Sequence, residues 1–376
     1  MGIYETLGVR RVINADARLT RLGGSLMPEP VLRAMEDAAT SYVDMFELQR
    51  AVGRRLAELT NNEAAYVSTG AATGLFLTTL ACMTGPDPAA IERLPSLEGL
   101  KNEILFQRVQ HFAYLPAVPL SGATLVEIGA EPEMHPAELE AAINERTAAV
   151  LYVAGEHMAT GALPLPEVIE IAHGRGVPVI VDAAAQLPPA SNLWYFTREL
   201  GADLVIFSGG KDLRGPQSSG LIVGRPDLIE ACLLNGAPNP RLGRPMKVGK
   251  EEMLGLLAAV DLYLAADEPA RIARFERIVA AWIAVFDGRP GVRAWRQFPN
   301  EAGQPMPRCV VEVDRAITGL TGADLVSRLW ESDPRIAVKQ HDETGISMTP
   351  DTLADGDEHV ITERLLEIVA AGSGRG

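Results

Sequence analysis

The chain has 376 residues, 47% of them hydrophobic, which is enough for two domains that each bury a core. Its 34 basic and 49 acidic residues give a formal net charge of −15, which disfavours nucleic acid and anionic membranes as partners. No segment reaches the apolar length of a membrane span, and the three widely spaced cysteines fit neither a disulfide framework nor a metal site, so we expect a cytoplasmic protein.

Residues 46–265 alternate short apolar runs with helical patterns, which is typical of an α/β domain with a mostly parallel sheet. The run 221–223 follows a turn-rich segment that is too short for a crossover helix, so we expect it to run antiparallel. The other expected strands are 64–67, 104–106, 123–128, 148–153, 177–181 and 204–207. The expected helices between them include 74–82, 136–144 and 166–173.

Near Lys250 the pattern changes to long helices. The apolar residues of segment 272–286 share one helical face, which predicts a helix that links the large domain to a smaller α+β domain. The elements expected in that smaller domain are strands 308–313 and 336–339 and helices 323–330 and 358–371. The predicted organisation is an N-terminal arm and helix (1–45), a large domain (46–265) and a small C-terminal domain with its linking helix (266–376).

An aspartate and a lysine follow two of the expected strands. Asp182 ends the pattern 177–181, and Lys211 lies just beyond 204–207. Ligands of open parallel sheets bind at the carboxyl ends of the strands, so we expect both side chains in one cleft, with one crossover helix between the strands. A lysine amine condenses with the aldehyde of pyridoxal phosphate, and an ionised aspartate keeps the pyridine nitrogen protonated. The pair therefore predicts a pyridoxal phosphate site.

The segment 68–74, STGAATG, stands where a strand gives way to an apolar helix. Small residues there let backbone N–H groups reach a phosphate at the positive end of the helix dipole. Ser208, three residues before the lysine, would add a hydroxyl group. An ordinary strand-to-helix turn is the alternative for this pattern, and a nucleotide site is disfavoured because GxGxxG and the P-loop lysine are both missing.

Motifs that belong together extend over nearly the whole chain. They are VINA (12–15), LGGS (22–25), VDM (43–45), ELQ (47–49), STGAA (68–72), VDAAA (181–185), FSGGK (207–211), GPQ (215–217) and GRPMKVGKEE (243–252). On these motifs the chain resembles the fold type I pyridoxal phosphate enzymes, also called aspartate aminotransferase-like. Within them it is most similar to the selenocysteine synthase-like group that includes D-glucosaminate-6-phosphate ammonia-lyase.

The resemblance implies that Lys211 is the Schiff-base lysine, that Asp182 is the partner of the pyridinium nitrogen, and that the enzyme is a homodimer or a larger assembly with active sites between subunits. His111 would stack on the cofactor ring, although a structural histidine is the alternative. The full set of cofactor-binding residues expected from the resemblance is Ser68, Thr69, Gly70, Ala71, His111, Asp182, Ala184, Ser208 and Lys211.

Candidate substrate-binding residues are basic. Arg244 and Lys247 precede a helix in a cationic run, Arg18 lies in a glycine-containing N-terminal segment, and Lys339 lies in the small domain, where Arg335 is its alternative. An exposed loop or helix entry explains several of them without a ligand.

Other polar positions also concern the substrate. Asp16 and Ala17 replace the usual Gly-Thr pair of the group, and Gln186 stands where an acidic residue is expected, so these positions put the group's known substrates in doubt. Glu156 or His157 would contact the cofactor or the substrate. The remaining histidines lack ligand spacing, so we expect no metal.

We therefore expect an enzyme that acts on a small amino acid or amino sugar acid. The favoured reaction is α-proton abstraction by Lys211 and β-elimination, which releases ammonia and a 2-oxo acid. Racemisation, aldol cleavage and aminotransfer begin in the same way and stay open. Transfer of selenium onto a charged tRNA is disfavoured by the acidic composition. A non-catalytic protein that binds the cofactor is the alternative from another functional class.

Overall fold

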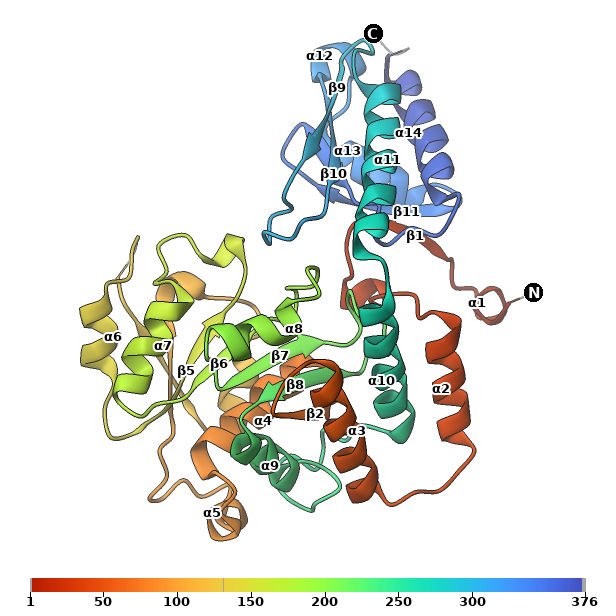
Figure 1. Cartoon of the computed structure of the whole chain (residues 1–376). Coiled ribbons are helices and arrows are strands. Elements are labelled where there is room, and N and C mark those ends of the chain that lie inside the picture. Colours follow the sequence, from red (N-terminus) through yellow and green to blue (C-terminus); the bar gives the residue numbers. More distant parts are fainter. Residues whose placement is uncertain (1, 131, 374–376) are drawn as a thin grey trace. The chain divides into compact units, whose positions relative to one another are not determined.

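The computed structural model describes residues 2–130 and 132–373 (Figure 1). The chain divides into two compact units. The larger unit comprises Met27–Ala266 with Glu301–Gly303, and the smaller unit comprises Met1–Leu26, Asp267–Asn300 and Gln304–Gly376. Residues 1–45, which the sequence suggests as one arm and helix, therefore contribute to both units. No helix among the described residues combines the length and the apolar character that a membrane span requires.

The larger unit contains a seven-stranded sheet in the order β2-β8-β7-β6-β5-β3-β4. Strands β4, β3, β5, β6 and β7 run parallel, and β8 pairs antiparallel with both of its neighbours, as the short connection predicts. The strands are β2 (Ala64–Ser68), β3 (Glu103–Gln107), β4 (Thr124–Ile128), β5 (Thr147–Val153), β6 (Val179–Asp182), β7 (Leu204–Ser208) and β8 (Gly220–Gly224). The expected α/β class with a mostly parallel sheet is confirmed.

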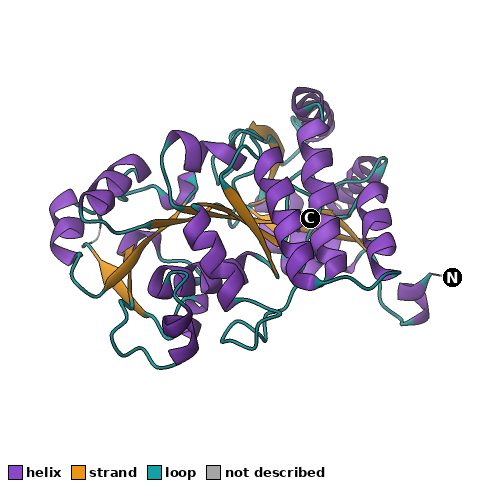
Figure 2. Ribbon diagram, turned by 60° about the horizontal axis from the view of Figure 1, so that its bottom comes forward, coloured by secondary structure: helices purple, strands orange, loops and turns teal. Residues whose placement is uncertain are grey.

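Both faces of this sheet are buried. Leu204 and Ile206 of β7 pack into one hydrophobic cluster, whereas Val205 and Phe207 pack into the other. Successive side chains of a strand point to opposite faces, so a strand covered on both sides has apolar residues at every position. Figure 2 shows helices on both sides of the strands. The helices of this unit are α2 (Glu29–Ala39), α3 (Met45–Leu59), α4 (Ala71–Thr84), α5 (Pro88–Arg93), α6 (Pro136–Ala142), α7 (Leu165–Gly174), α8 (Asn192–Trp194), α9 (Pro226–Asn235) and α10 (Lys250–Ala265).

The connection from β6 to β7 differs from the expected regular crossover helix. It contains only the three-residue helix α8, followed by a π-helical turn over Tyr195–Glu199. The proline pair after Leu187 explains part of this difference, because proline lacks an N–H donor and restricts the residue before it. The helical part of the connection is therefore shorter and less regular than its length suggests.

The smaller unit contains a five-stranded sheet in the order β1-β11-β12-β10-β9. β1 (Val12–Ala15) pairs in parallel with β11, and the other pairs are antiparallel. The remaining strands are β9 (Val292–Gln297), β10 (Arg308–Val313), β11 (Arg335–Gln340) and β12 (Gly345–Met348). The helices are α1 (Ile3–Thr6), α11 (Glu268–Phe286), α12 (Arg315–Thr318), α13 (Gly322–Glu331) and α14 (Asp357–Ser373). α11 buries Phe275, Val279, Trp282 and Phe286, which lie on the face that the helical spacing predicts.

Candidate active site

Asp182 and Lys211 lie at the same edge of the large sheet. Asp182 is the last residue of β6, which pairs in parallel with β7, and Lys211 follows the end of β7 by three residues. Asp182 is only 7% exposed. Burial raises the pKa of its carboxyl group, while the N–H of Ala184, which donates to Asp182 Oδ1 at 3.0 Å, and the charge of Lys211 lower that pKa. The structure thus brings a buried carboxylate into electrostatic contact with the lysine.

The N-terminus of α4 offers backbone donors. Gly70 precedes the helix with φ at +90°, and no side chain caps the helix. A Cβ atom on Gly70 would meet no heavy atom within 4 Å, so the first turn, which begins at Ala71, is open on this side. Ser68 Oγ donates to the carbonyl of Gly70 at 2.9 Å, which fixes the turn. Free N–H groups at the positive end of a 14-residue helix match a phosphate.

β8 holds this turn in place. Thr69 Oγ1 donates to the carbonyl of Ser218 at 3.3 Å, just before β8 begins. A Cβ atom on Gly220 would lie 2.7 Å from the carbonyl carbon of Gly70, so the two backbones approach closely only because residue 220 is a glycine. Because β8 also pairs with β7, the same strand supports both the helix N-terminus and the lysine loop.

The loop that carries Lys211 is closely packed. A Cβ atom on Gly209 would lie 2.1 Å from Ser219 Oγ, and one on Gly210 would lie 2.5 Å from Gln217 Oε1, so both positions require glycine. Ser208, the last residue of β7, pairs with Gly220.

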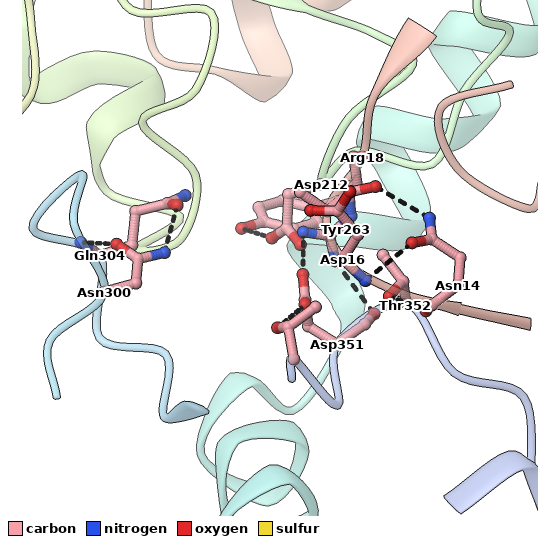
Figure 3. Close-up of polar contacts among 11 residues, drawn as sticks. Asn14, Asp16, Arg18, Asp212, Tyr263, Asn300, Gln304, Asp351 and Thr352 are labelled. Atoms are coloured by element: carbon pink, nitrogen blue, oxygen red, sulfur yellow. Dashed lines mark hydrogen bonds and ion pairs between the residues drawn. The ribbon is translucent and has the colours of Figure 1, made fainter. Parts of the chain in front are cut away.

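The next residue, Asp212, is 2% exposed and accepts a hydrogen bond from the hydroxyl of Tyr263 of α10 at 2.8 Å (Figure 3). Sequence reasoning missed Asp212. Its only signal in the sequence is an acidic residue directly after Lys211.

Buried glutamines support the neighbouring strand ends. Gln110 is 0% exposed, and its amide donates to the carbonyl of Val153 and accepts from the N–H of Val153, both at 3.1 Å. This pair of bonds ties the end of β5 to the segment after β3. His111 follows on the same edge, is exposed, and lies with its ring 6.3 Å from that of Phe106. Its stacking on a cofactor ring stays a prediction.

Gln186 lies four residues beyond Asp182. Its backbone is fixed, because its N–H donates to the carbonyl of Ala183 at 3.0 Å and its carbonyl accepts from Asn192 Nδ2 at 2.6 Å. Its side chain points toward Gly155 and His157, which follow β5. Gln186, His157 and Asp182 therefore belong to the same edge of the sheet.

The expected substrate-binding residues divide between the two units. Arg18 of the smaller unit is 9% exposed and forms an ion pair with the buried Asp351 (Figure 3). Lys339 is exposed near the end of β11. Arg244 and Lys247 of the larger unit are exposed in the segment before α10.

Two other polar residues near these positions have protein partners. Lys250 binds Glu251 at 2.6 Å and the carbonyl of Ala38, and Asp16 binds Arg21 at 2.6 Å. Within the described residues no group of three or more acidic, histidine or cysteine side chains is arranged for a metal ion.

The chain is similar to known proteins over almost its full length. Residues 89–239 match the aminotransferase class-V family. A 5'-C-glycyluridine monooxygenase-decarboxylase from Streptomyces sp is 37% identical over 97% of this chain and 92% of the relative. A D-glucosaminate-6-phosphate ammonia lyase from Salmonella typhimurium (strain 14028s / SGSC 2262) is 32% identical over 97% of both chains.

A solved structure of D-glucosaminate-6-phosphate ammonia-lyase superposes with a TM-score of 0.86 at 30% identity, covering 99% of both chains. The open N-terminus of α4 and the buried carboxylate beside a lysine fit the phosphate and the ring nitrogen of pyridoxal phosphate. The chain belongs to the fold type I pyridoxal phosphate-dependent enzymes, in the selenocysteine synthase-like group that includes D-glucosaminate-6-phosphate ammonia-lyase.

Proposed function

We propose that this protein is an ammonia-lyase that acts on a hydroxylated small amino acid or amino sugar acid. Loss of the α-proton and of a β-hydroxyl group as water, followed by hydrolysis, gives a 2-oxo acid and ammonia. The observation that carries the proposal is the buried Asp182 carboxylate beside Lys211 at the ends of β6 and β7. The full-length similarity to an ammonia lyase supports this reaction over the other reactions that begin with the same proton.

Bound pyridoxal phosphate supplies a ring that accepts the electron pair left when the α-proton departs. In our proposal the Asp182 carboxylate faces the ring nitrogen, and its negative charge favours the protonated form of that nitrogen. The N–H groups at the start of α4 hold the phosphate, with Ser68 and Thr69 fixing the turn. The Lys211 amine takes up the α-proton, and the exposed Arg244 and Lys247 attract an anionic substrate.

We also infer a homodimer or larger homo-oligomer with active sites between subunits, located in the cytoplasm. Family membership supports the assembly, and the exposed apolar side chains Leu32, Tyr42, Val43 and Phe46 around α2 and α3 are suited to a protein interface. Sedimentation of the cofactor-loaded protein tests the assembly. Mixing subunits that carry different inactive site variants then tests shared active sites, because only a shared site regains activity on mixing.

A substrate screen tests the reaction. The cofactor-loaded protein is incubated with amino acids and phosphorylated amino sugar acids, and ammonia and 2-oxo acids are measured together. Equal amounts of both products, with no need for an added amino acceptor, support the proposal. Epimerised substrate, an aldehyde product or a requirement for an acceptor would instead identify racemisation, aldol cleavage or aminotransfer.

A second candidate is oxygen-dependent decarboxylation, because the relative at 37% identity is a monooxygenase-decarboxylase. Carbon dioxide release and oxygen uptake in the same screen distinguish it from ammonia release. A strict need for oxygen would favour this second reaction, and full ammonia release under anaerobic conditions would favour the first.

A further inference from the structure

Gln186 has a buried amide group without a partner. Its side chain is 8% exposed, and Nε2 makes no hydrogen bond to any described residue. Burying an amide donor without a partner costs about 1–3 kcal/mol. The backbone of Gln186 is held by hydrogen bonds to Ala183 and Asn192. The unpartnered amide nitrogen is therefore a feature of the side chain in a well-fixed segment. Such a group is expected where a ligand supplies the missing acceptor.

The amide lies close to the backbone just after β5. Gly155 has φ at +137°, and a Cβ atom built on it would lie 2.9 Å from Gln186 Nε2 and 2.8 Å from His157 Cε1. The amide and the imidazole therefore both pack against the backbone of Gly155. A glycine is required at this position, both for its backbone conformation and because a Cβ atom would collide with both groups.

The charges nearby decide the kind of ligand. The carboxyl group of Asp182 is buried four residues before Gln186, and a second buried anion beside it would be repelled. A neutral hydroxyl group carries no such penalty and accepts a hydrogen bond from an amide as readily as a carboxylate does. The position therefore suits a hydroxyl oxygen.

We propose that Gln186, with His157, forms a subsite that binds a hydroxyl group on the substrate chain beyond the α-carbon. This inference rests on the proposed function and names the residues that bind the hydroxyl group of its substrate. Gln186 is then a specificity-determining residue, and the exchange of an acidic residue for glutamine at this position changes which substrates bind.

The first test needs neither cofactor nor turnover. Gln186→Met keeps the length of the side chain and removes the unpartnered donor, so it should raise the Tm of the cofactor-free protein by about 2–4 °C. The matched control is Gln110→Met. Gln110 is also buried but is bonded to both backbone groups of Val153, so this substitution should lower the Tm by about 4 °C or more. A fall in the Tm of Gln186→Met would show a structural role and overturn the inference.

The second test uses three amino acids with one four-carbon skeleton. The absorbance of the cofactor-loaded protein is titrated with 2-aminobutyrate, threonine and homoserine, which carry no hydroxyl, a β-hydroxyl and a γ-hydroxyl group. Wild-type protein should bind one of the hydroxylated compounds about tenfold more tightly than 2-aminobutyrate. In Gln186→Met this preference should disappear, and the affinity for 2-aminobutyrate should stay the same.

The outcomes separate the subsite from the proposed function. Binding of 2-aminobutyrate with no preference for either hydroxylated compound in the wild-type protein overturns the subsite alone. Absorbance that responds to none of the three contradicts the proposed function for small amino acids, and the Tm comparison still tests the subsite. If Gln186→Met shifts the absorption maximum or the affinity of the cofactor and leaves the hydroxyl preference intact, the amide serves the cofactor and the inference is wrong.

Discussion

Asp182 and Lys211 follow neighbouring parallel strands, and the charge of the lysine lowers the pKa of the aspartate against the larger, opposite effect of burial. A carboxylate in this environment is stabilised by any positive charge placed beside it. A protonated pyridine nitrogen is such a charge. The pair is therefore suited to hold a cationic ring from one side and to move protons on the other.

Replacement of the lysine gives the first prediction. Lys211→Ala should lower turnover by about 10³-fold or more, because both the amine that attaches the cofactor and the base are removed. The far-ultraviolet circular dichroism should stay that of the wild-type protein. Steady-state ammonia release measures the effect.

Chemical trapping gives the control. The chain has five lysines, Lys101, Lys211, Lys247, Lys250 and Lys339. Borohydride reduction of the cofactor-loaded protein, followed by peptide mapping, should place the pyridoxyl group on Lys211 only. Lys101→Ala serves as the matched variant, because this exposed residue precedes β3 and lies at the opposite edge of the sheet. An adduct on another lysine, or wild-type turnover of Lys211→Ala, contradicts the assignment.

The second prediction concerns Asp182 and pH. Burial raises its pKa in the folded protein above the ordinary value of 3.8, so the folded state binds the proton more tightly than the unfolded state. The resulting stability is complete below about pH 3.8 and is lost as the pH rises through the folded value. Asp182→Asn should therefore raise the Tm of the cofactor-free protein at pH 8 and have little effect at pH 4.

The cofactor should reverse the sign of this effect. With pyridoxal phosphate bound, the ionised carboxylate has its cationic partner, so Asp182→Asn should reduce the Tm gain on cofactor binding and lower turnover by about 10²-fold or more. Thermal melts with and without the cofactor at both pH values measure this. An unchanged Tm gain on cofactor binding would show that Asp182 does not face the ring.

A third prediction follows from the contact between Asp212 and Tyr263. This hydrogen bond connects the residue after Lys211 to α10. Tyr263→Phe should lower the free energy of unfolding by about 1–2 kcal/mol, because a buried carboxylate loses a donor. Asp212→Asn keeps an acceptor for the hydroxyl group and should cost less than Asp212→Ala. Urea denaturation of Tyr263→Phe, Asp212→Ala and the double variant gives the coupling free energy between the two residues. A coupling free energy near zero would show that the bond does not stabilise the fold.

The larger unit could be predicted well from the sequence. Its central strands are buried on both faces and are continuous apolar runs, so the polar residues at their ends, such as Asp182 and Lys211, are easily recognised. The direction of β8 followed from the length of the connection before it. These features depend only on residues that are close together in the sequence, so they can be predicted without knowledge of the fold.

The smaller unit shows where local reasoning ends. β1 pairs with β11, more than 300 positions away, and nothing near Val12–Ala15 indicates that partner. β9 carried a usable signal, because Val292 and Ala294 are buried while Arg293 is exposed, but the alternation is short. β12 has only four residues.

The same limit applies to the site. The missing partner of the Gln186 amide, the bond between Asp212 and Tyr263, and the buried ion pair of Arg18 with Asp351 all depend on residues that are distant in the sequence. Their residue types alone indicated that Gln186 and Arg18 are candidates for contact with the substrate. Only the packing shows that the Gln186 amide nitrogen has no partner while the Arg18 side chain is engaged within the smaller unit.

The last prediction concerns the turn before α4. Gly70 has φ at +90° and ψ at 161°, a conformation that essentially only glycine adopts, so Gly70→Ala should cost roughly 1–3 kcal/mol of stability. Relief of that strain would turn the N–H groups of the first helical turn away from the phosphate. The Kd for pyridoxal phosphate should rise about tenfold or more, while the Kd for pyridoxal, which has no phosphate, should change little.

Gly201→Ala is the matched control. Gly201 has φ at +87°, has no heavy atom within 4 Å of an added Cβ atom, and precedes β7 at the other edge of the sheet. The Gly201→Ala variant should lose stability in the same way but keep the preference for pyridoxal phosphate over pyridoxal. The comparison therefore separates the effect of backbone strain from the loss of phosphate binding. Titration of each cofactor-free variant with both compounds measures the preference. If Gly70→Ala and Gly201→Ala keep it equally, the phosphate is bound by groups other than the N-terminus of α4.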